Sequence, residues 1–310
     1  MTFDGILNYL RKPHGLFFYL ANRGYYDKMP DEEYLRRVYR FSLGAEPDFD
    51  HPKNFNEKLN WMKLHDHNPL YTTMVDKYAV KSYVAERIGA EHVIPLVGGP
   101  WNSPDEIDFD ALPDQFVLKC THDSGSFVVC RGKEGFDREA AKAKLRKRLA
   151  QRYFYKNREW AYKDVQPRII AEKYIPTLGN PDSLEYKLTC FNGVAKIITV
   201  CRGVPHASLD ARTNDNYDRD GNHLPWYAFY RNAAVEPGLP PEIDQIVAYA
   251  EKLTAGIPQV RCDFYLIDGQ IYFGEFTFYT WAGFIEFTPP EWNDIMGSWI
   301  KLPCDEEQEA

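Results

Sequence analysis

The segment that best indicates how this chain folds is Arg261-Cys-Asp-Phe-Tyr-Leu-Ile-Asp-Gly-Gln-Ile-Tyr-Phe-Gly-Glu-Phe-Thr-Phe278. It predicts two β-strands joined by a turn at Asp268-Gly269. Because side chains alternate between the faces of a strand, Arg261 and Asp263 share one face, as do Glu275 and Thr277 on the return strand. An arginine and two carboxylates, each backed by apolar residues, indicate a site for a hard cation and an anion. The alternative is an ordinary amphipathic hairpin with a solvated, salt-bridged face.

The connection between the two strands determines whether these side chains meet. A two-residue turn would pair Ile267 with Gln270 and leave Glu275 on the opposite face. A three-residue loop over 267–269, with Gly269 left-handed, would pair Arg261 with Glu275. Only an odd loop or a bulge brings the four polar side chains together, and we predict this odd arrangement.

Composition limits the class of protein. The chain has 310 residues, a net charge of −8 and 44% hydrophobic residues, so it is globular, and its acidity argues against a general nucleic-acid binder. Its six cysteines form no C-x-x-C pair, which favours buried free thiols in a reducing compartment, the cytoplasm. We expect no signal peptide and no membrane span. The amphipathic segment 6–20 leaves peripheral membrane contact open, although packing on its own domain is favoured.

Hairpins interspersed with helices predict an α+β fold rather than a doubly wound sheet. We expect helix over about 5–45, a helix capped by Asn54 or Asn56, a helix starting near Asp76-Lys77, and a loop-rich region over 203–240. The predicted organisation is a helical N-terminal region (1–70), a small lobe (71–175), a large lobe (176–303) and an acidic tail (304–310).

Lys119 ends an apolar strand directly before a loop of small polar residues. The amides and hydroxyls of Ser124, Gly125 and Ser126 are suited to cradle a phosphate, with the lysine supplying charge. A hairpin turn with a lysine at its edge is the alternative. Lys77 is placed poorly for the dipole of the predicted helix, which indicates that it has some other role or is plain surface charge.

Two further acidic motifs are weaker. Glu172 is the only acid in an apolar strand and needs a donor, for which an adenine amine or a nearby arginine would serve. Asp218-Arg-Asp220 matches the D-x-D pattern of nucleotide-sugar transferases, a pattern that is common by chance.

Taken together, the motifs resemble the ATP-grasp superfamily and, more closely, its TupA-like branch, named for teichuronopeptide synthesis. The resemblance covers roughly 50–303 and rests on Lys53-Asn-Phe-Asn-Glu-Lys-Leu-Asn-Trp61-Met-Lys-Leu64, Asn68-Pro-Leu-Tyr71, Val75-Asp-Lys77, Phe116-Val-Leu-Lys119-Cys, Arg158-Glu-Trp160, Pro167-Arg-Ile-Ile-Ala-Glu-Lys-Tyr174 and Tyr272-Phe-Gly-Glu-Phe-Thr-Phe278.

The resemblance implies an ATP-grasp fold, in which two α+β lobes hold MgATP between them. Lys77 and Lys119 would hold the phosphates under loop 121–126. Glu172 and the backbone of Lys173, Tyr174 and Ile175 would read adenine, and Glu185 the ribose. Asp263, Glu275 and Thr277 would hold Mg²⁺. Arg261 would stabilise the charge that develops on the tetrahedral intermediate.

The implied reaction is ATP-dependent ligation of a carboxylate to an amine through an acyl phosphate. The branch suggests a hexuronic acid of a capsular polysaccharide or its precursor, and an amino acid or small amino alcohol. Candidate substrate-binding residues are Lys187, Arg202, His206, Arg212, Arg219, Trp226, Tyr227 and Trp281.

Two departures from the pattern stand out. The superfamily usually has Glu-x-Asn where this chain has Glu275-x-Thr277, and a hydroxyl still coordinates a metal. A Pro-Gly-rich stretch is replaced by Tyr279-Thr-Trp-Ala-Gly283, which puts the acceptor contacts in question. A glycosyltransferase that uses Asp218 and Asp220, and a non-catalytic polysaccharide-binding protein, remain the alternatives.

Overall fold

The computed structural model describes residues 14–175, 183–203 and 211–303. The predicted tail 304–310, with Cys304, and the candidate His206 lie outside the described residues. The helices are α2 (Gly15–Ala21), α3 (Asp31–Leu43), α4 (Phe55–His65), α5 (Pro69–Val75), α6 (Val80–Ile88), α7 (Arg138–Leu149), α8 (Phe154–Asn157), α9 (Ile243–Thr254) and α10 (Trp292–Trp299). The fold is α+β, as predicted.

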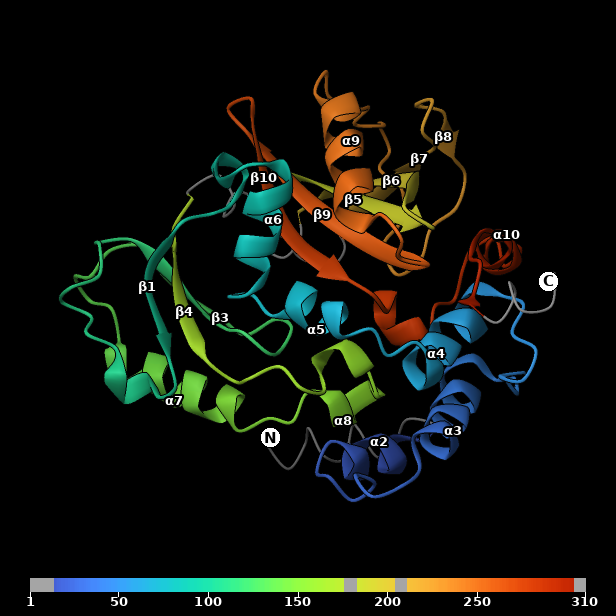
Figure 1. Ribbon diagram of the computed structural model, residues 1–310, viewed down its shortest axis with the longest axis horizontal. Helices are drawn as coiled ribbons and strands as arrows, with labels where there is room; N and C mark the ends of the chain where they lie inside the picture. Colours follow the sequence, from blue (N-terminus) through green and yellow to red (C-terminus); the bar gives the residue numbers. More distant parts are fainter. Residues whose placement is uncertain (1–13, 176–182, 204–210, 304–310) are drawn as a thin grey trace.

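Two antiparallel sheets organise the described residues (Figure 1). The first has the order β1-β4-β2-β3, from β1 (Leu96–Trp101), β4 (Ile169–Lys173), β2 (Phe116–Cys120) and β3 (Phe127–Cys130). The second has the order β10-β9-β5-β6-β7-β8, from β10 (Gln270–Thr277), β9 (Gln259–Ile267), β5 (Leu184–Phe191), β6 (Val194–Arg202), β7 (Thr213–Tyr217) and β8 (His223–Leu224).

The described residues 211–240 are loop-rich, as predicted, but they contain the short strands β7 and β8, which the sequence did not indicate. The polar sequence of β7 hid it, because strand prediction relies on apolar alternation. In the structure Asn216 is buried, and its side chain accepts a hydrogen bond of 2.7 Å from the Thr199 hydroxyl and donates one of 2.9 Å to the Trp226 carbonyl. Hydrogen bonds to neighbouring segments therefore stabilise β7 as a strand, although its sequence has no apolar alternation.

Helix ends follow local sequence signals where those signals are strong. Asn54 caps α4 by accepting a hydrogen bond of 3.0 Å from the Glu57 amide, and Glu57 accepts one of 3.3 Å from the Asn54 amide. Within the described residues 14–45, the region predicted to be helical contains α2 and α3. The predicted helix at Asp76-Lys77 begins only at Val80, because Asp76 ends α5 and its carboxylate accepts from the next amides.

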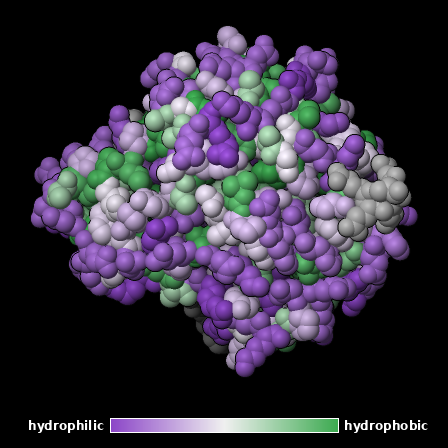
Figure 2. Space-filling model, viewed as in Figure 1, coloured by the Kyte–Doolittle hydropathy of each residue, from purple (hydrophilic) through white to green (hydrophobic). Residues whose placement is uncertain are grey.

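Three apolar clusters lie beneath these elements. The largest packs α4, α5, α6, α9 and α10 against the six-stranded sheet, a second lies under the four-stranded sheet and α7, and a third lies within the N-terminal helices. Five described cysteines are free and buried, as predicted. Hydrophilic residues cover most of the face shown in Figure 2. Among the described residues no helix is both long and apolar enough to cross a membrane.

Candidate active site between the two sheets

The β9–β10 hairpin turns at Asp268-Gly269, as predicted. Ile267 pairs with Gln270, so the turn contains only Asp268 and Gly269, whose φ angles are 51° and 78°. Two positive φ values are typical of the tight turns that match the twist of a hairpin, and Asp and Gly both tolerate them. The turn therefore supplies no extra residue, and of the two odd arrangements considered the three-residue loop, with its pairing of Arg261 and Glu275, does not form.

A bulge further along the hairpin restores the predicted shared face. The register shifts between Phe273 and Phe276, where Gly274 and Glu275 together lie opposite the single residue Asp263. The extra residue reverses the alternation of β10 from that point. Thr277 then pairs with Arg261.

Arg261 joins the polar side chains on this face. Its guanidinium donates two hydrogen bonds of 2.7 Å to the Asp263 carboxylate and one of 3.0 Å to the Thr277 hydroxyl. A carboxylate oxygen of Glu275 lies 3.9 Å from the same guanidinium. Lys187 adds a contact of 3.0 Å to Asp263. Burial opposes the charged form of Asp263, but the charges of Arg261 and Lys187 outweigh it and lower its pKa.

These residues fit the donor chemistry that Mg²⁺ prefers. Asp263, Glu275 and Thr277 offer hard oxygen donors from one face, and the Glu275 side chain is 45% exposed. Over the described residues, no three His, Cys, Asp or Glu side chains are grouped to hold a metal by themselves. Two carboxylates still suit Mg²⁺, which is usually held by one or two carboxylates together with phosphate and water oxygens.

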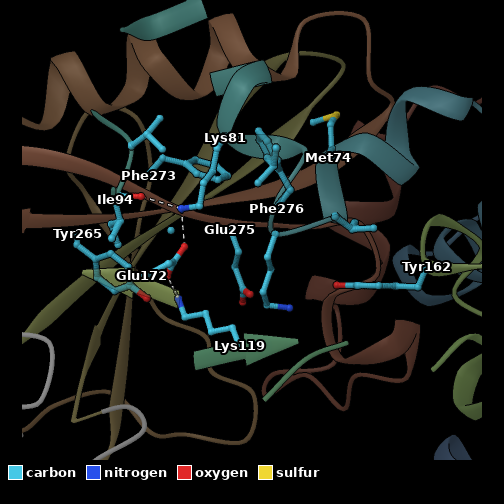
Figure 3. A pocket seen from close by; sticks show the side chains of 15 residues that line it. Met74, Lys81, Ile94, Lys119, Tyr162, Glu172, Tyr265, Phe273, Glu275 and Phe276 are labelled. Atoms are coloured by element: carbon cyan, nitrogen blue, oxygen red, sulfur yellow. Dashed lines mark hydrogen bonds and ion pairs between the residues drawn. The ribbon is translucent and has the colours of Figure 1, made fainter. Parts of the chain in front are cut away.

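A first cavity lies between the two sheets and is lined by charged residues from both sides: Lys77, Lys81, Lys119, Glu172 and Glu275. Figure 3 shows Glu172 between Lys81 and Lys119, with Glu275 reaching into the same space. The surrounding walls are mostly apolar and aromatic, with Met74, Ile94, Tyr162, Tyr265, Phe273 and Phe276 among them. Three lysines against two carboxylates give this partly apolar cavity an excess of positive charge, which suits a polyanion.

Glu172 is bound to two lysines rather than to the arginine considered from its sequence. Its carboxylate oxygens lie 2.5 Å from Lys81 and 2.5 Å from Lys119. Burial opposes ionisation, yet the two ammonium groups lower the pKa of Glu172 to about 2. The sequence reasoning missed Lys81, because a lysine within a helix carries no motif. An adenine contact for Glu172 stays a prediction.

Lys77 is held in place by the loop that follows β2. Its backbone amide donates to the Thr121 carbonyl at 3.2 Å, and its ammonium group contacts the Asp123 carbonyl. Asp76 next to it pairs with Arg168 at 2.8 Å. Burial lowers the pKa of Lys77. The residue is therefore an organised part of the cavity and not loose surface charge.

The small-residue loop is ordered by its own buried acid. Asp123 accepts from the Ser126 hydroxyl and pairs with Arg148 at 2.9 Å. Gly125 has a φ of 76°, and Ser124 lines a second cavity. Ser126 thus supports the loop, whereas Ser124 and Gly125 lie at its exposed tip.

The predicted adenine-reading backbone lies at the end of the hairpin. Lys173, Tyr174 and Ile175 line a further cavity together with Ile267 and Tyr272. The two sheets therefore bring this hinge segment close to the hairpin turn.

The second cavity adjoins the first, since Tyr162 and Glu275 line both. It is wider than the first cavity. Its charged lining residues are Glu159, Lys187, Arg261 and Glu275, and its aromatic ones are Tyr153, Tyr162, Tyr230, Tyr279 and Trp281. Smaller residues complete the lining: Ser124, Asn157, Cys201, Asn214, Thr277 and Ala282. The aromatic ring of Trp281 is stacked on Phe229 with 3.9 Å between ring centroids. The sequence reasoning missed Tyr153, Glu159 and Tyr162 as parts of this site.

The remaining candidates are spread out. Glu185 pairs with Lys187 at 2.9 Å, and Arg212 lies 3.3 Å from the hydroxyl of Tyr230. Arg202 is exposed at the end of β6 and lines neither cavity. Asp218 accepts hydrogen bonds from its own turn, so the D-x-D motif has a local structural role here.

A family described as TupA-like ATP-grasp matches residues 57–301, which include every charged residue of the first cavity. The chain belongs to this family. The resemblance seen in the motifs is confirmed, and the two sheets with a charged cavity between them are its ATP-grasp architecture. A comparison with curated protein sequences finds no match.

Solved structures of ATP-grasp ligases are similar to this chain. An L-amino acid ligase from Bacillus licheniformis has 15% identity and a TM-score of 0.44, covering 81% of this chain and 56% of that one. A D-alanine–D-alanine ligase from Bacillus anthracis, complexed with ATP, has 16% identity and a TM-score of 0.38, covering 66% and 54%. D-cycloserine synthetase DcsG has 17% identity and a TM-score of 0.37, covering 68% and 64%. The chain thus spans less than two thirds of the length of each.

Proposed function

We propose that this TupA-like ATP-grasp protein is an ATP-dependent ligase that joins a carboxylate to an amine and releases ADP and phosphate. The observation that carries the proposal is the meeting of two cavities at Glu275. One is rich in lysine and suited to a triphosphate, and the other is lined by Arg261 and Thr277 and suited to the reacting carboxylate. The γ-phosphoryl group would therefore arrive where the carboxylate is bound.

The proposed roles of the site residues follow this arrangement. Lys77 and Lys119 hold the phosphates, with Ser124, Gly125 and Ser126 in the loop that covers them. The hinge 172–175 binds adenine, and Glu185 binds the ribose. These contacts divide between the predicted small lobe (71–175) and large lobe (176–303), a division that stays a proposal.

Asp263, Glu275 and Thr277 are the residues we propose for Mg²⁺. When bound, Mg²⁺ offsets the negative charge of the phosphates. Arg261 already donates to Asp263 and Thr277, so its guanidinium lies beside the proposed metal donors. It is placed to stabilise the oxyanion of the tetrahedral intermediate.

For the substrate we propose a hexuronic acid of a capsular polysaccharide or its precursor. The exposed Trp281, stacked on Phe229 beside the second cavity, offers an apolar face to a sugar ring. Lys187 and Arg212 supply positive charge near that cavity, and Arg202 supplies it farther away. The amine partner is an amino acid or small amino alcohol, and the need for ATP implies a cytoplasmic reaction.

A nucleotide screen by thermal shift tests the proposal. ATP with Mg²⁺ should raise the unfolding midpoint, because a ligand that binds only the native state stabilises it. A rise with UDP-glucuronate but none with ATP would instead favour a glycosyltransferase.

Release of ADP, measured with glucuronate and a panel of amines, is the second test. Asp263→Asn should abolish Mg²⁺-dependent release. Asp215→Asn is the matched control, because Asp215 is equally buried in the same sheet and lines neither cavity. Equal activity of the two variants would contradict the metal assignment.

A further inference from the structure

The segment Arg158-Glu159-Trp160 has no role in the proposed function so far. Two of its residues have structural roles. Arg158 is fully buried and bonds to Asp31 at 2.8 Å and to the Tyr26 carbonyl at 2.7 Å, which ties the segment to the N-terminal helices. The ring of Trp160 is stacked on His67 at 4.8 Å. Glu159 between them contributes to neither contact and lines the second cavity.

Glu159 is buried but weakly partnered. Its side chain receives a hydrogen bond from the Asn157 amide at a long 3.4 Å. Lys63 acts on it electrostatically, yet the Lys63 ammonium donates to the Ala282 carbonyl at 2.6 Å and to the Asn60 side chain at 2.9 Å. A buried carboxylate ordinarily has stronger donors, because an unpaired anion is costly away from water. Glu159 therefore retains capacity to accept a donor from the cavity.

The other groups that act electrostatically with Glu159 do not neutralise it. The neighbours Tyr153, Tyr162 and Tyr279 are uncharged phenols at neutral pH. The positive charge of Lys156 lowers the pKa of Glu159, but less than Lys63 does. Burial raises the pKa of Glu159, and the charge of Lys63 only partly offsets this. A raised pKa makes a carboxylate a better proton acceptor near neutral pH.

The second cavity carries charges on two different parts of the fold. Arg261 and Lys187 line it from β9 and β5, with the proposed metal donor Glu275 beside them on β10, whereas Glu159 belongs to the turn that precedes the short helical turn 160–162. A ligase needs such a division, because its carboxylate substrate is an anion and its amine substrate arrives as an ammonium ion. The cationic side suits the first substrate and Glu159 suits the second.

We propose that Glu159 binds the ammonium group of the amine substrate in the second cavity and accepts a proton from it before the amine attacks. This inference rests on the proposed ligase activity. It assigns Glu159 as a catalytic residue for the amine half of the reaction.

The ammonium group, R–NH₃⁺, transfers one proton to the Glu159 carboxylate and becomes R–NH₂. Its lone pair forms the C–N bond at the acyl carbon, and the bond between that carbon and the phosphate oxygen breaks. Phosphate leaves with the electron pair and takes up the second N–H proton, and Glu159 then loses its proton to solvent. The products are the amide and phosphate.

Two nucleophiles test the inference. Hydroxylamine is largely uncharged at neutral pH and traps an acyl phosphate without a base, whereas ethanolamine must first lose a proton. With ATP, Mg²⁺ and glucuronate, Glu159→Gln should slow amide formation from ethanolamine about 100-fold while hydroxamate formation stays near the wild-type rate. Raising the pH should restore the ethanolamine rate of the variant, as free amine becomes available.

Glu57→Gln is the matched control, because Glu57 is 8% exposed against 7% for Glu159 but caps α4 away from both cavities. It should leave the ratio of the two rates unchanged. If Glu159→Gln fails to fold, Glu159→Asp keeps the charge and should lower the ethanolamine rate selectively.

The outcomes separate the two proposals. If wild-type protein forms neither product with any uronate tested, the ligase proposal itself fails, and this inference fails with it. If wild type forms both products and the Glu159 variant slows both equally, without rescue at high pH, the ligase proposal stands and Glu159 is only a structural partner of Lys63.

Discussion

The two cavities that meet at Glu275 differ in how their buried carboxylates are partnered. In the first, Glu172 is 6% exposed and lies 2.5 Å from each of two lysines. In the second, Glu159 is 7% exposed and accepts one hydrogen bond of 3.4 Å from the side-chain amide of Asn157. The pKa of Glu172 falls to about 2, whereas that of Glu159 rises. Nearly equal burial thus goes with pKa shifts in opposite directions, because neighbouring cations rather than burial decide whether the carboxylate anion is stable.

The largest expected effect comes from removing the carboxylate of Glu172, which is ion-paired in the first cavity. Glu172→Gln leaves Lys81 and Lys119 in the cavity without their shared anion, and should cost about 3 kcal/mol of unfolding free energy at pH 7. Because the folded pKa of Glu172 lies below its ordinary value of 4.5, this stability is present above about pH 4.5 and is lost as the pH falls toward 2.

Urea unfolding of both proteins at pH 7 and at pH 3 measures this effect. The difference between wild type and Glu172→Gln should shrink at the lower pH. A difference that is the same at both pH values would show that the two ion pairs contribute nothing as charges.

The next effect concerns the bulge that joins the cavities. A methyl group added at Gly274 would lie 3.1 Å from the Asp263 carbonyl and 3.1 Å from the Tyr265 ring, which is tighter than ordinary packing. Gly274→Ala should therefore destabilise the protein by about 1–2 kcal/mol. Thermal unfolding would detect it. Gly132→Ala is the control, because its added methyl meets its nearest neighbour only at 3.8 Å and should be tolerated. Equal midpoints would count against the bulge geometry.

The smallest effect concerns the wall of the second cavity. Ala282 has φ 56° and ψ 22°, a left-handed conformation that costs an alanine about 1 kcal/mol more than a glycine. Ala282→Gly should stabilise the protein by about 0.5–1 kcal/mol, although glycine substitutions usually destabilise. Ala143→Gly, on the exposed face of α7, should instead destabilise the protein by about 0.5–1 kcal/mol. Chemical denaturation of both variants measures the two opposite signs, and destabilisation by both would contradict the left-handed backbone.

Much of the fold was predictable because its signals are local. The hairpin over 261–278, the cap of α4 by Asn54 and the position of Lys119 at the end of β2 each follow from a few neighbouring residues. The family motifs are local in the same sense. The shared face of the hairpin was predictable too, but the sequence did not decide between an odd loop and the bulge that produces it.

The missed residues share a different physical origin. Lys81 meets Glu172 from a helix that lies far from it in sequence, and β7 is a strand because β6 pairs with it. Glu159 joins the site because the turn that carries it lies beside the second cavity. No periodicity or spacing within the chain marks such contacts.

By itself, the sequence determined most of the strands and helices, which side chains share a face of the β9–β10 hairpin, and which family the chain belongs to. These properties depend on backbone preferences and on neighbours a few residues apart. Only the tertiary structure decided which buried carboxylates have a lowered pKa and which have a raised one. That choice depends on distances between charges brought together by folding, and such distances are encoded in no single segment.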